Sequence, residues 1–138
     1  MITSTITEVV NAINSGSYSI PLTAVQRWTP ETEKGDTETV CFVWCSDMSL
    51  SREDRCGLSM FDVNIKVGIR KPVDVGDVSA VNQVVEASEE VAKELLGASF
   101  NGGQAISSID WVSPVEIDEL YEDSVVISIF EIKLRGLN

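Results

Sequence analysis

The feature that most constrains how this chain can fold is the segment from residue 78 to residue 96, where apolar side chains recur at helical spacing. Asp77 stands at the expected N-cap and Gly97 at the expected end of the helix. Ser88 interrupts the apolar stripe, but its hydroxyl can bond back to a carbonyl one turn earlier. A helix with one apolar face must cover another surface, so the segment predicts a sheet beneath it. The stripe consists of Val81, Val84, Val85, Val91, Ala92, Leu95 and Leu96.

Four segments with the composition of strands flank this helix. Residues 39–45 are β-branched and aromatic, which predicts a strand covered on both faces. Residues 61–70 alternate apolar and polar side chains, and residues 105–112 place two large apolar side chains on one face. Residues 124–135 are apolar along one face, and we expect the other face to be covered over half its length. That other face begins with Val125, Ile127 and Ile129 and ends with Glu131, Lys133 and Arg135.

A shorter helix is expected at residues 5–14, with Thr5 and Glu8 as a capping box. Residues 22–29 have the composition of an extended segment. Residues 46–57 are rich in Ser, Asp and Arg and predict a long loop.

Together these segments predict one α+β domain over residues 1–138. Its core would be a single antiparallel-rich sheet of about four to five strands. One long helix packs on that sheet, and a short helix precedes it near the N-terminus. The length of 138 residues fits one domain with a substantial core.

The charge balance excludes some classes of partner. The formal net charge is −12, from 22 acidic and 10 basic residues. A protein that grips nucleic acid or an anionic membrane needs clustered Lys and Arg, so neither class is favoured. No segment has the length and hydrophobicity expected of a membrane helix, and the first residues do not have the pattern of a signal peptide.

Three cysteines, Cys41, Cys45 and Cys56, leave at least one thiol unpaired, which fits a reducing cytoplasm. Cys41 and Cys45 share one face of a predicted strand, so a metal or redox pair is one interpretation. Small buried hydrophobic side chains are the favoured alternative, because the chain contains no histidine to complete a zinc site. We therefore predict no metal site, no cofactor and no catalytic residues, and a protein that is not an enzyme.

Two acidic clusters lie outside the predicted strands. Neither has the ligand order or central glycine of a calcium loop, and paired carboxylates for glycoside chemistry would need a cleft that a domain of this size hardly accommodates. We interpret both clusters as solvated or partner-facing loops. The first, a candidate channel or partner-facing loop, consists of Glu31, Glu33, Asp36 and Glu38. The second, a candidate subunit interface, consists of Glu116, Asp118, Glu119, Glu122 and Asp123.

The basic side chains are concentrated on two of the predicted strands. If those strands are neighbours, one sheet surface is locally basic and could meet an acidic loop of the same chain or of a neighbouring copy. Ordinary cross-strand pairing with Asp62 and Glu131 is the alternative, and it stays open. The basic residues concerned are Lys66, Arg70, Lys133 and Arg135.

The segment Ile6–Asn14, with the sequence ITEVVNAIN, and the segment Leu22–Glu31, with the sequence LTAVQRWTPE, resemble small neck proteins of tailed bacteriophages. The order of helix, strands, long helix and two further strands is similar as well. Members of this family are tail terminators, tail-completion proteins or head–tail joining proteins.

The resemblance implies an α+β subunit of a hexameric ring at the head-proximal end of a phage tail. The ring would end the growth of the tail tube and join the tail to the head connector, with DNA passing through its channel as cargo. The implied location is the virion, after assembly in the host cytoplasm. The partners would be other copies of this chain, the tail tube protein and the connector protein, with no membrane involved.

Two other classes of function remain open. One is a small acidic ligand-binding or regulatory α+β domain, which would be a monomer with a defined small-molecule site. The other is an acidic inhibitor that mimics DNA, which would present a continuous acidic ridge to a basic enzyme.

Overall fold

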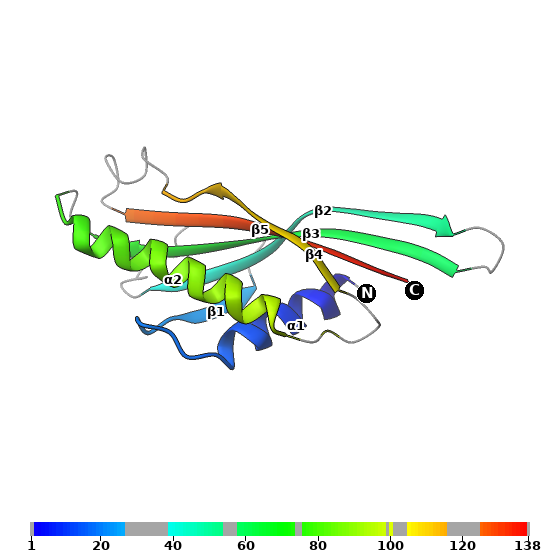
Figure 1. The fold of residues 1–138 in the computed structure, drawn as a ribbon, viewed down its shortest axis with the longest axis horizontal. Helices are drawn as coiled ribbons and strands as arrows, with labels where there is room; N and C mark the ends of the chain where they lie inside the picture. The colour runs from blue at the N-terminus through cyan, green and yellow to red at the C-terminus, as the bar shows by residue number, and fades with distance from the viewer. Residues whose placement is uncertain are drawn as a thin grey trace.

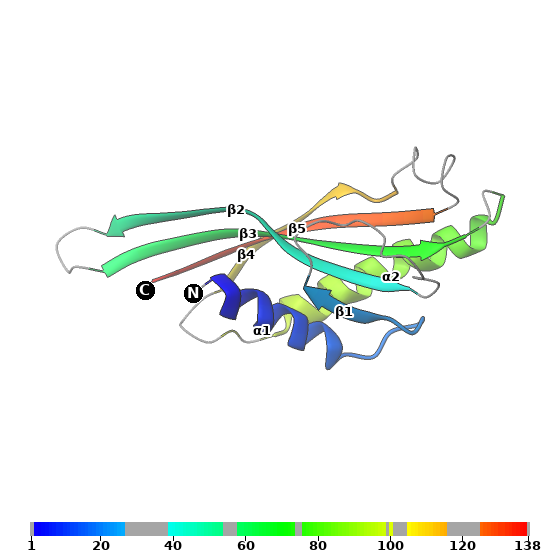
Figure 2. The same ribbon diagram turned by 180° about the vertical axis from the view of Figure 1, so that it is seen from behind.

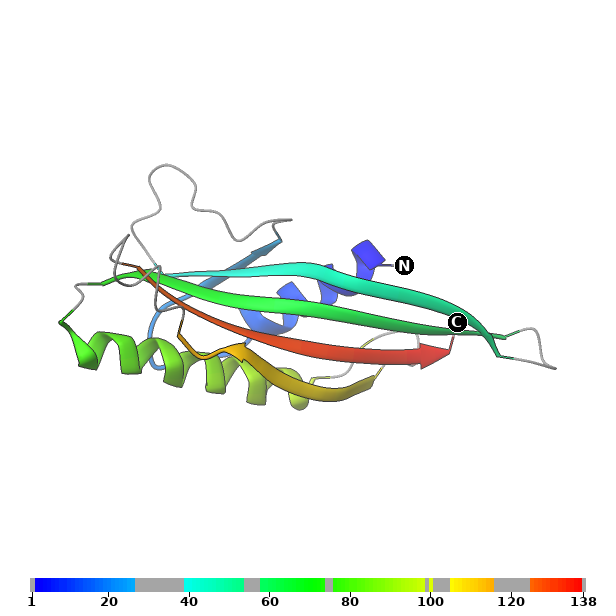
Figure 3. The ribbon, with the colours of Figure 1, turned by 90° about the horizontal axis from the view of Figure 1, so that it is seen from above.

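The computed structural model describes residues 2–26, 39–53, 58–73, 76–98, 100, 105–115 and 125–137. Its five-stranded sheet has the strand order β1-β2-β3-β5-β4, with one helical layer on one face (Figures 1 and 3). The elements are α1 (Ile2–Asn14), β1 (Thr23–Gln26), β2 (Val40–Glu53), β3 (Leu58–Pro72), α2 (Val78–Leu96), β4 (Ala105–Ser113) and β5 (Val125–Leu137). Only β1 runs parallel to its neighbour, so the predicted antiparallel-rich α+β fold is confirmed.

The core lies between the sheet and the two helices. Alternate residues of β3 from Phe61 to Ile69 point toward the helices and are buried. They stand opposite residues of β5 whose side chains enter the same core, such as Val67 opposite Phe130. Helix α2 contributes Val84, Ala87, Ser88, Val91, Ala92 and Leu95 to this core. The predicted stripe is thus largely buried. The prediction is wrong for Leu96, which is 61% exposed.

Both ends of α2 are where the sequence predicts them. The Asp77 carboxylate accepts a hydrogen bond from the Ala80 backbone N–H at 3.0 Å, as an N-cap should. The Gly97 N–H donates back to the carbonyl of Lys93. The predicted bond from the Ser88 hydroxyl to the preceding turn is also present, 2.6 Å from the Val85 carbonyl oxygen. This bond allows a polar side chain to be fully buried against the sheet.

Helix α1 begins earlier than expected. It starts at Ile2, so Thr5 and Glu8 lie inside the helix and the predicted capping box is wrong. At its other end the Asn14 side chain is bonded to the Ala24 backbone in both directions. The Asn14 amide donates to the Ala24 carbonyl at 3.1 Å, and its oxygen accepts from the Ala24 N–H at 2.8 Å. These two hydrogen bonds tie α1 to β1, the short strand within the segment that was expected to be extended.

The predicted loop at residues 46–57 is largely wrong. β2 continues to Glu53 and β3 begins at Leu58, so the two strands form a long hairpin that projects beyond the helices (Figure 2). A β-bulge at Ser46 interrupts the register between Cys45 and Asp47. The Ser46 hydroxyl lies 3.1 Å from the Asn64 carbonyl oxygen and 3.2 Å from a carboxylate oxygen of Glu131. The bulged residue is thereby bonded across the sheet rather than left in solvent.

Val91 provides a direct test of the packing between α2 and the sheet. Because Val91 is fully buried in the core, Val91→Asp places a carboxylate where no water reaches. We expect a loss of at least about 4 kcal/mol of unfolding free energy, enough to abolish cooperative melting in a marginally stable domain. Gln83→Asp introduces the same side chain at an exposed position of α2 and should leave the melting temperature nearly unchanged. Equal melting of the two variants and the parent protein would disprove the packing.

Candidate interaction surfaces

The sheet face turned away from the helices, called here the outer face, carries charged side chains over one half. β3 and β5 are neighbours, as the basic-surface prediction required, and their charges stand opposite one another. Lys66 is opposite Glu131, and Asp62 is opposite Arg135. Arg135 Nε lies 2.9 Å from Asp62 Oδ1 in an exposed ion pair. The register therefore places two of the four predicted basic residues opposite acidic ones across the strands, as the alternative left open by the sequence expected, with a close ion pair at Arg135.

The other half of the outer face is apolar and largely buried. Phe42 of β2 is opposite Gly68 of β3, which is opposite Ile129 of β5. The ring of Trp44 lies across Gly68, so a Cβ at that glycine would stand 3.3 Å from the ring. Glycine here lets a large aromatic side chain lie flat on the neighbouring strand.

This apolar half also contains Arg70. Arg70 is only 7% exposed and stands between Val40 of β2 and Ile127 of β5. Val125 and Ile127 are buried as well, at 5% and 7% exposed. These three candidate interface residues thus offer little accessible area within a single chain. Lys66 and Lys133, in contrast, are accessible on the charged half.

The acidic candidates lie outside the described residues. This applies both to the cluster from Glu116 to Asp123 and to the cluster from Glu31 to Glu38. Their proximity to the basic strands therefore stays a prediction. Cys56, the third cysteine, is outside the described residues too.

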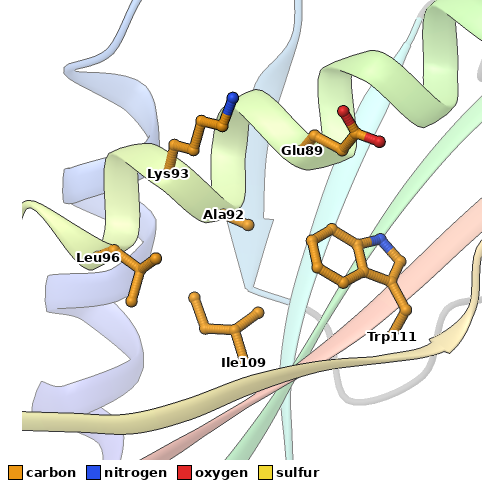
Figure 4. A pocket seen from close by; sticks show the side chains of 6 residues that line it. All are labelled: Glu89, Ala92, Lys93, Leu96, Ile109 and Trp111. Carbon is orange, nitrogen blue, oxygen red and sulfur yellow. The ribbon is translucent and has the colours of Figure 1, made fainter.

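A groove that sequence reasoning missed runs between α2 and β4, on the helix side of the sheet. Its volume is about 430 Å³. Figure 4 shows its floor and walls, which consist of Glu89, Ala92, Lys93 and Leu96 from α2 and Ile109 and Trp111 from β4. The sequence feature connected with this groove is Leu96, an apolar residue at the end of the stripe. Its exposure, and so its connection with the groove, is recognised only once the packing is known.

Trp111 is fixed in the groove by two contacts. Its indole N–H donates to the Ser88 hydroxyl oxygen at 3.2 Å, and its ring lies 5.5 Å from the ring of Phe130. Ser88 therefore accepts from β4 while it donates within α2, so one hydroxyl joins the helix to the edge strand. The tryptophan is still 37% exposed, which leaves apolar surface available to a partner.

The projecting hairpin presents a second apolar surface. Met48 and Leu50 stand opposite Val63 and Phe61 and so point to the helix side of the sheet. The helices do not cover them, and they are 46% and 58% exposed. The bulge at Ser46 sets this direction, because it shifts the alternation of β2 by one residue.

Cys41 and Cys45 are free thiols on the helix side of β2, the same-face arrangement that their spacing predicted. Burial raises the pKa of Cys41 to about 12 and also raises the pKa of Cys45. Tyr18 has a pKa raised to about 12, chiefly by burial and then by the charge of Glu94. With these pKa values, the thiol of Cys41 and the phenol of Tyr18 stay neutral well into the alkaline range, where unburied groups of the same kind ionise.

The described residues contain no group of three or more Cys, Asp or Glu side chains placed to bind a metal ion. Over the same ranges, neither helix combines the length and hydrophobicity that spanning a bilayer requires. No protein-family model matches the chain, and no curated protein matches it significantly.

Thiol reactivity tests the environment of the cysteines. At pH 8 a group with a pKa of about 12 has roughly one thiolate per ten thousand molecules, so Cys41 should be alkylated at least a hundredfold more slowly in the native than in the denatured protein. Peptide mass spectrometry measures the two rates. Cys45 is the internal comparison, because it is partly exposed. Rapid native alkylation of Cys41, or a Cys41–Cys45 disulfide, would contradict this environment.

The same burial predicts how stability depends on pH. The folded state holds the Cys41 proton more tightly than the unfolded chain does, whose thiol titrates near 9.0. The contribution of this thiol to stability is therefore full below pH 9 and is lost as the pH rises toward 12. Tyr18 acts in the same direction over an overlapping range. Denaturant unfolding of Cys41→Ala from pH 8 to 11 should show a smaller loss of stability than the parent protein, and equal slopes would argue against the shift.

Proposed function

We propose that this chain is a structural protein of a phage virion that forms a ring at the head-proximal end of the tail. In this role it ends growth of the tail tube and joins the tail to the head connector. The observation that carries the proposal is the resemblance of residues 6–14 and 22–31 to phage neck proteins, in a chain whose order of elements is similar. The proposal assigns the chain no chemical step, so its function depends on contact surfaces.

The arrangement of surfaces supports a subunit that contacts others of its kind. The groove between α2 and β4 and the apolar hairpin lie on opposite margins of one sheet. Different surfaces that meet head to tail generate rings when the rotation closes. The two margins are therefore suited to heterologous contacts between copies.

Charge opposes such a ring and limits how it can form. Six copies at −12 each carry −72, so the contacts must bury apolar area and pair opposite charges to overcome repulsion. In the proposed neck ring, an acidic surplus on the channel wall would let DNA pass without binding to it. The acidic residues Glu31 to Glu38 are the candidates for that wall or for a partner-facing loop.

One observation favours the alternative of a ligand-binding domain. The groove between α2 and β4 falls within the size range of small-molecule sites and is mostly apolar. A ligand-binding domain would be a monomer whose groove closes around a small molecule. The measured mass of the native particle separates this alternative, and the DNA-mimic inhibitor, from the ring.

Native mass spectrometry at low and moderate salt tests the ring. We expect a particle of about 90 kDa, which is six copies of 15.0 kDa. A protein that stays at 15.0 kDa, both alone and in the presence of tail tubes, would remove the ring from consideration.

Charge reversal on the outer face tests whether its basic residues stabilise the particle. Arg70 is unsuitable because it is buried, so the informative variant is Lys66→Glu with Lys133→Glu, both accessible. We expect a shift toward monomer that is largest at low salt, where repulsion is least screened. The control for net charge combines Asn11→Glu, Ser79→Glu, Asn82→Glu and Gln83→Glu at exposed helix positions, which lowers the net charge by the same amount. An unchanged particle at low salt would exclude the charged half of the outer face from the subunit contacts.

A further inference from the structure

Among the described strands, the sheet has two margins at which no further strand pairs, and their lengths are similar. β1 pairs with β2 only at residues 40–43, so no described strand lies beside the outer edge of β2 from Trp44 to Glu53. At the other margin β4 pairs with β5 on one side, and no described strand lies on its other side. Figure 3 shows these two strands at opposite margins of the sheet. An edge of this length with free N–H and C=O groups is a template for another strand.

The two edges match in direction and in face. β2 and β4 run in opposite directions, so a second copy placed beside the first in the same orientation would bring them together as an antiparallel pair. In that pair the helix sides of both copies are continuous. Met48 and Leu50 of one copy then lie beside Ile109 and Trp111 of the other, over the apolar groove.

We propose that the outer edge of β2 beyond Cys45 adds to the outer edge of β4 in a second copy of this chain, and that Met48 and Leu50 fill the groove between α2 and β4. The inference rests on the proposed ring and names the contact that builds it. The occupant is a second copy because this chain supplies both halves of the contact. One half is an exposed apolar strand edge, and the other is an apolar groove beside β4, whose outer edge has no partner among the described strands.

Charge excludes one register of this contact, and the contacts of Met48 favour another. With Met48 opposite Ile109, the acidic side chains of Asp47 and Asp110 would face each other on the outer face, which is unfavourable. A shift of two residues places Leu50 opposite Ile109 and Met48 opposite Trp111. Ser49 then stands opposite Asp110, and no acidic pair results. The thioether of Met48 also meets an aromatic ring, which is a favourable contact.

This register is compatible with closure into a ring. Within one copy Asp110, Glu131, Lys66 and Trp44 lie at the same level across the sheet. The next copy brings Ser49 to that level, which is four ladder positions from Trp44 because Ser46 is bulged. Each copy is therefore displaced along the strand direction by about 13 Å relative to its neighbour, and one copy is four strands wide, about 19 Å. This displacement tilts the strands by roughly 35° from the axis of a closed ring, a value typical of sheets that close on themselves.

Disulfide cross-linking tests the register. In a Cys45→Ser, Cys56→Ser background, Ser49→Cys with Asp110→Cys should form disulfides between copies under mild oxidation, visible as a ladder of multimers without reductant. Ser49→Cys with Ser108→Cys is the control pair, because these positions would be opposite in the disfavoured register, offset by two residues, and both aspartates are kept; it should cross-link at least tenfold less. Each single-cysteine variant reports random collision. Equal or stronger cross-linking of the offset pair would overturn the register.

Substitution of Leu50 tests the apolar contact. Leu50→Lys alters an exposed side chain, so the fold should persist, and melting measurements will verify this. The variant also reduces the net negative charge, which by itself would favour association. We nevertheless expect self-association to weaken roughly tenfold or more, because a lysine replaces apolar area buried in the groove. Val78→Lys is the matched control at an exposed apolar position, 68% accessible, in the first turn of α2.

The outcomes separate this contact from the ring itself. An assembled parent protein in which the designed pair fails to cross-link, or in which Leu50→Lys and Val78→Lys assemble equally, overturns the edge contact and leaves the ring intact. A parent protein that stays monomeric alone and with tail tubes overturns both. Cross-linking of the designed pair together with selective loss of assembly in Leu50→Lys establishes the contact.

Discussion

The antiparallel pairing of β3 with β5 is the interaction on which the rest of this structure depends. Thirteen residue pairs, from Met60 opposite Leu137 to Pro72 opposite Val125, stand in unbroken register. Their helix side supplies the central residues of the core, and α2 packs against it. The same register places apolar side chains opposite each other over one half of the outer face and charged side chains over the other. A slip of one residue would exchange the two faces, so burial on the helix side fixes the charge pattern as well.

The strongest periodic signals predicted the fold well. The helix at residues 78–96 and its caps follow from side-chain spacing and from the local chemistry of Asp77 and Ser88. The hairpin could not be predicted in the same way, because its serines and aspartates resemble those of a loop. Those residues form a strand because β3 offers a long partner, which is a tertiary effect. The short parallel strand β1 is likewise defined by its partner β2 rather than by its own composition.

The candidate surfaces were predictable only in part. Sequence places Lys66, Lys133 and Arg135 on two strands, but only the register shows that Arg135 meets Asp62. Arg70 follows the same alternation, yet it lies in the apolar half and is buried, which no local pattern reveals. The groove beside Trp111 arises from the distance between a helix and an edge strand, a property of packing. Residue types therefore indicated which side chains were available, and topology decided which of them share a surface.

The bulge at Ser46 has an evolutionary consequence. It is a single inserted residue that the ladder passes over, so the later side chains of β2 face the side set by their β3 partners. Removal of Ser46 would let Asp47 follow Cys45 directly, opposite Asn64 as now, and Met48 and Leu50 would keep their direction. A lineage could thus lose this codon while the hairpin kept its apolar and hydrophilic sides. Length variation at this position is where descendants of such a protein could change the chain without changing the surface that it presents to a neighbour.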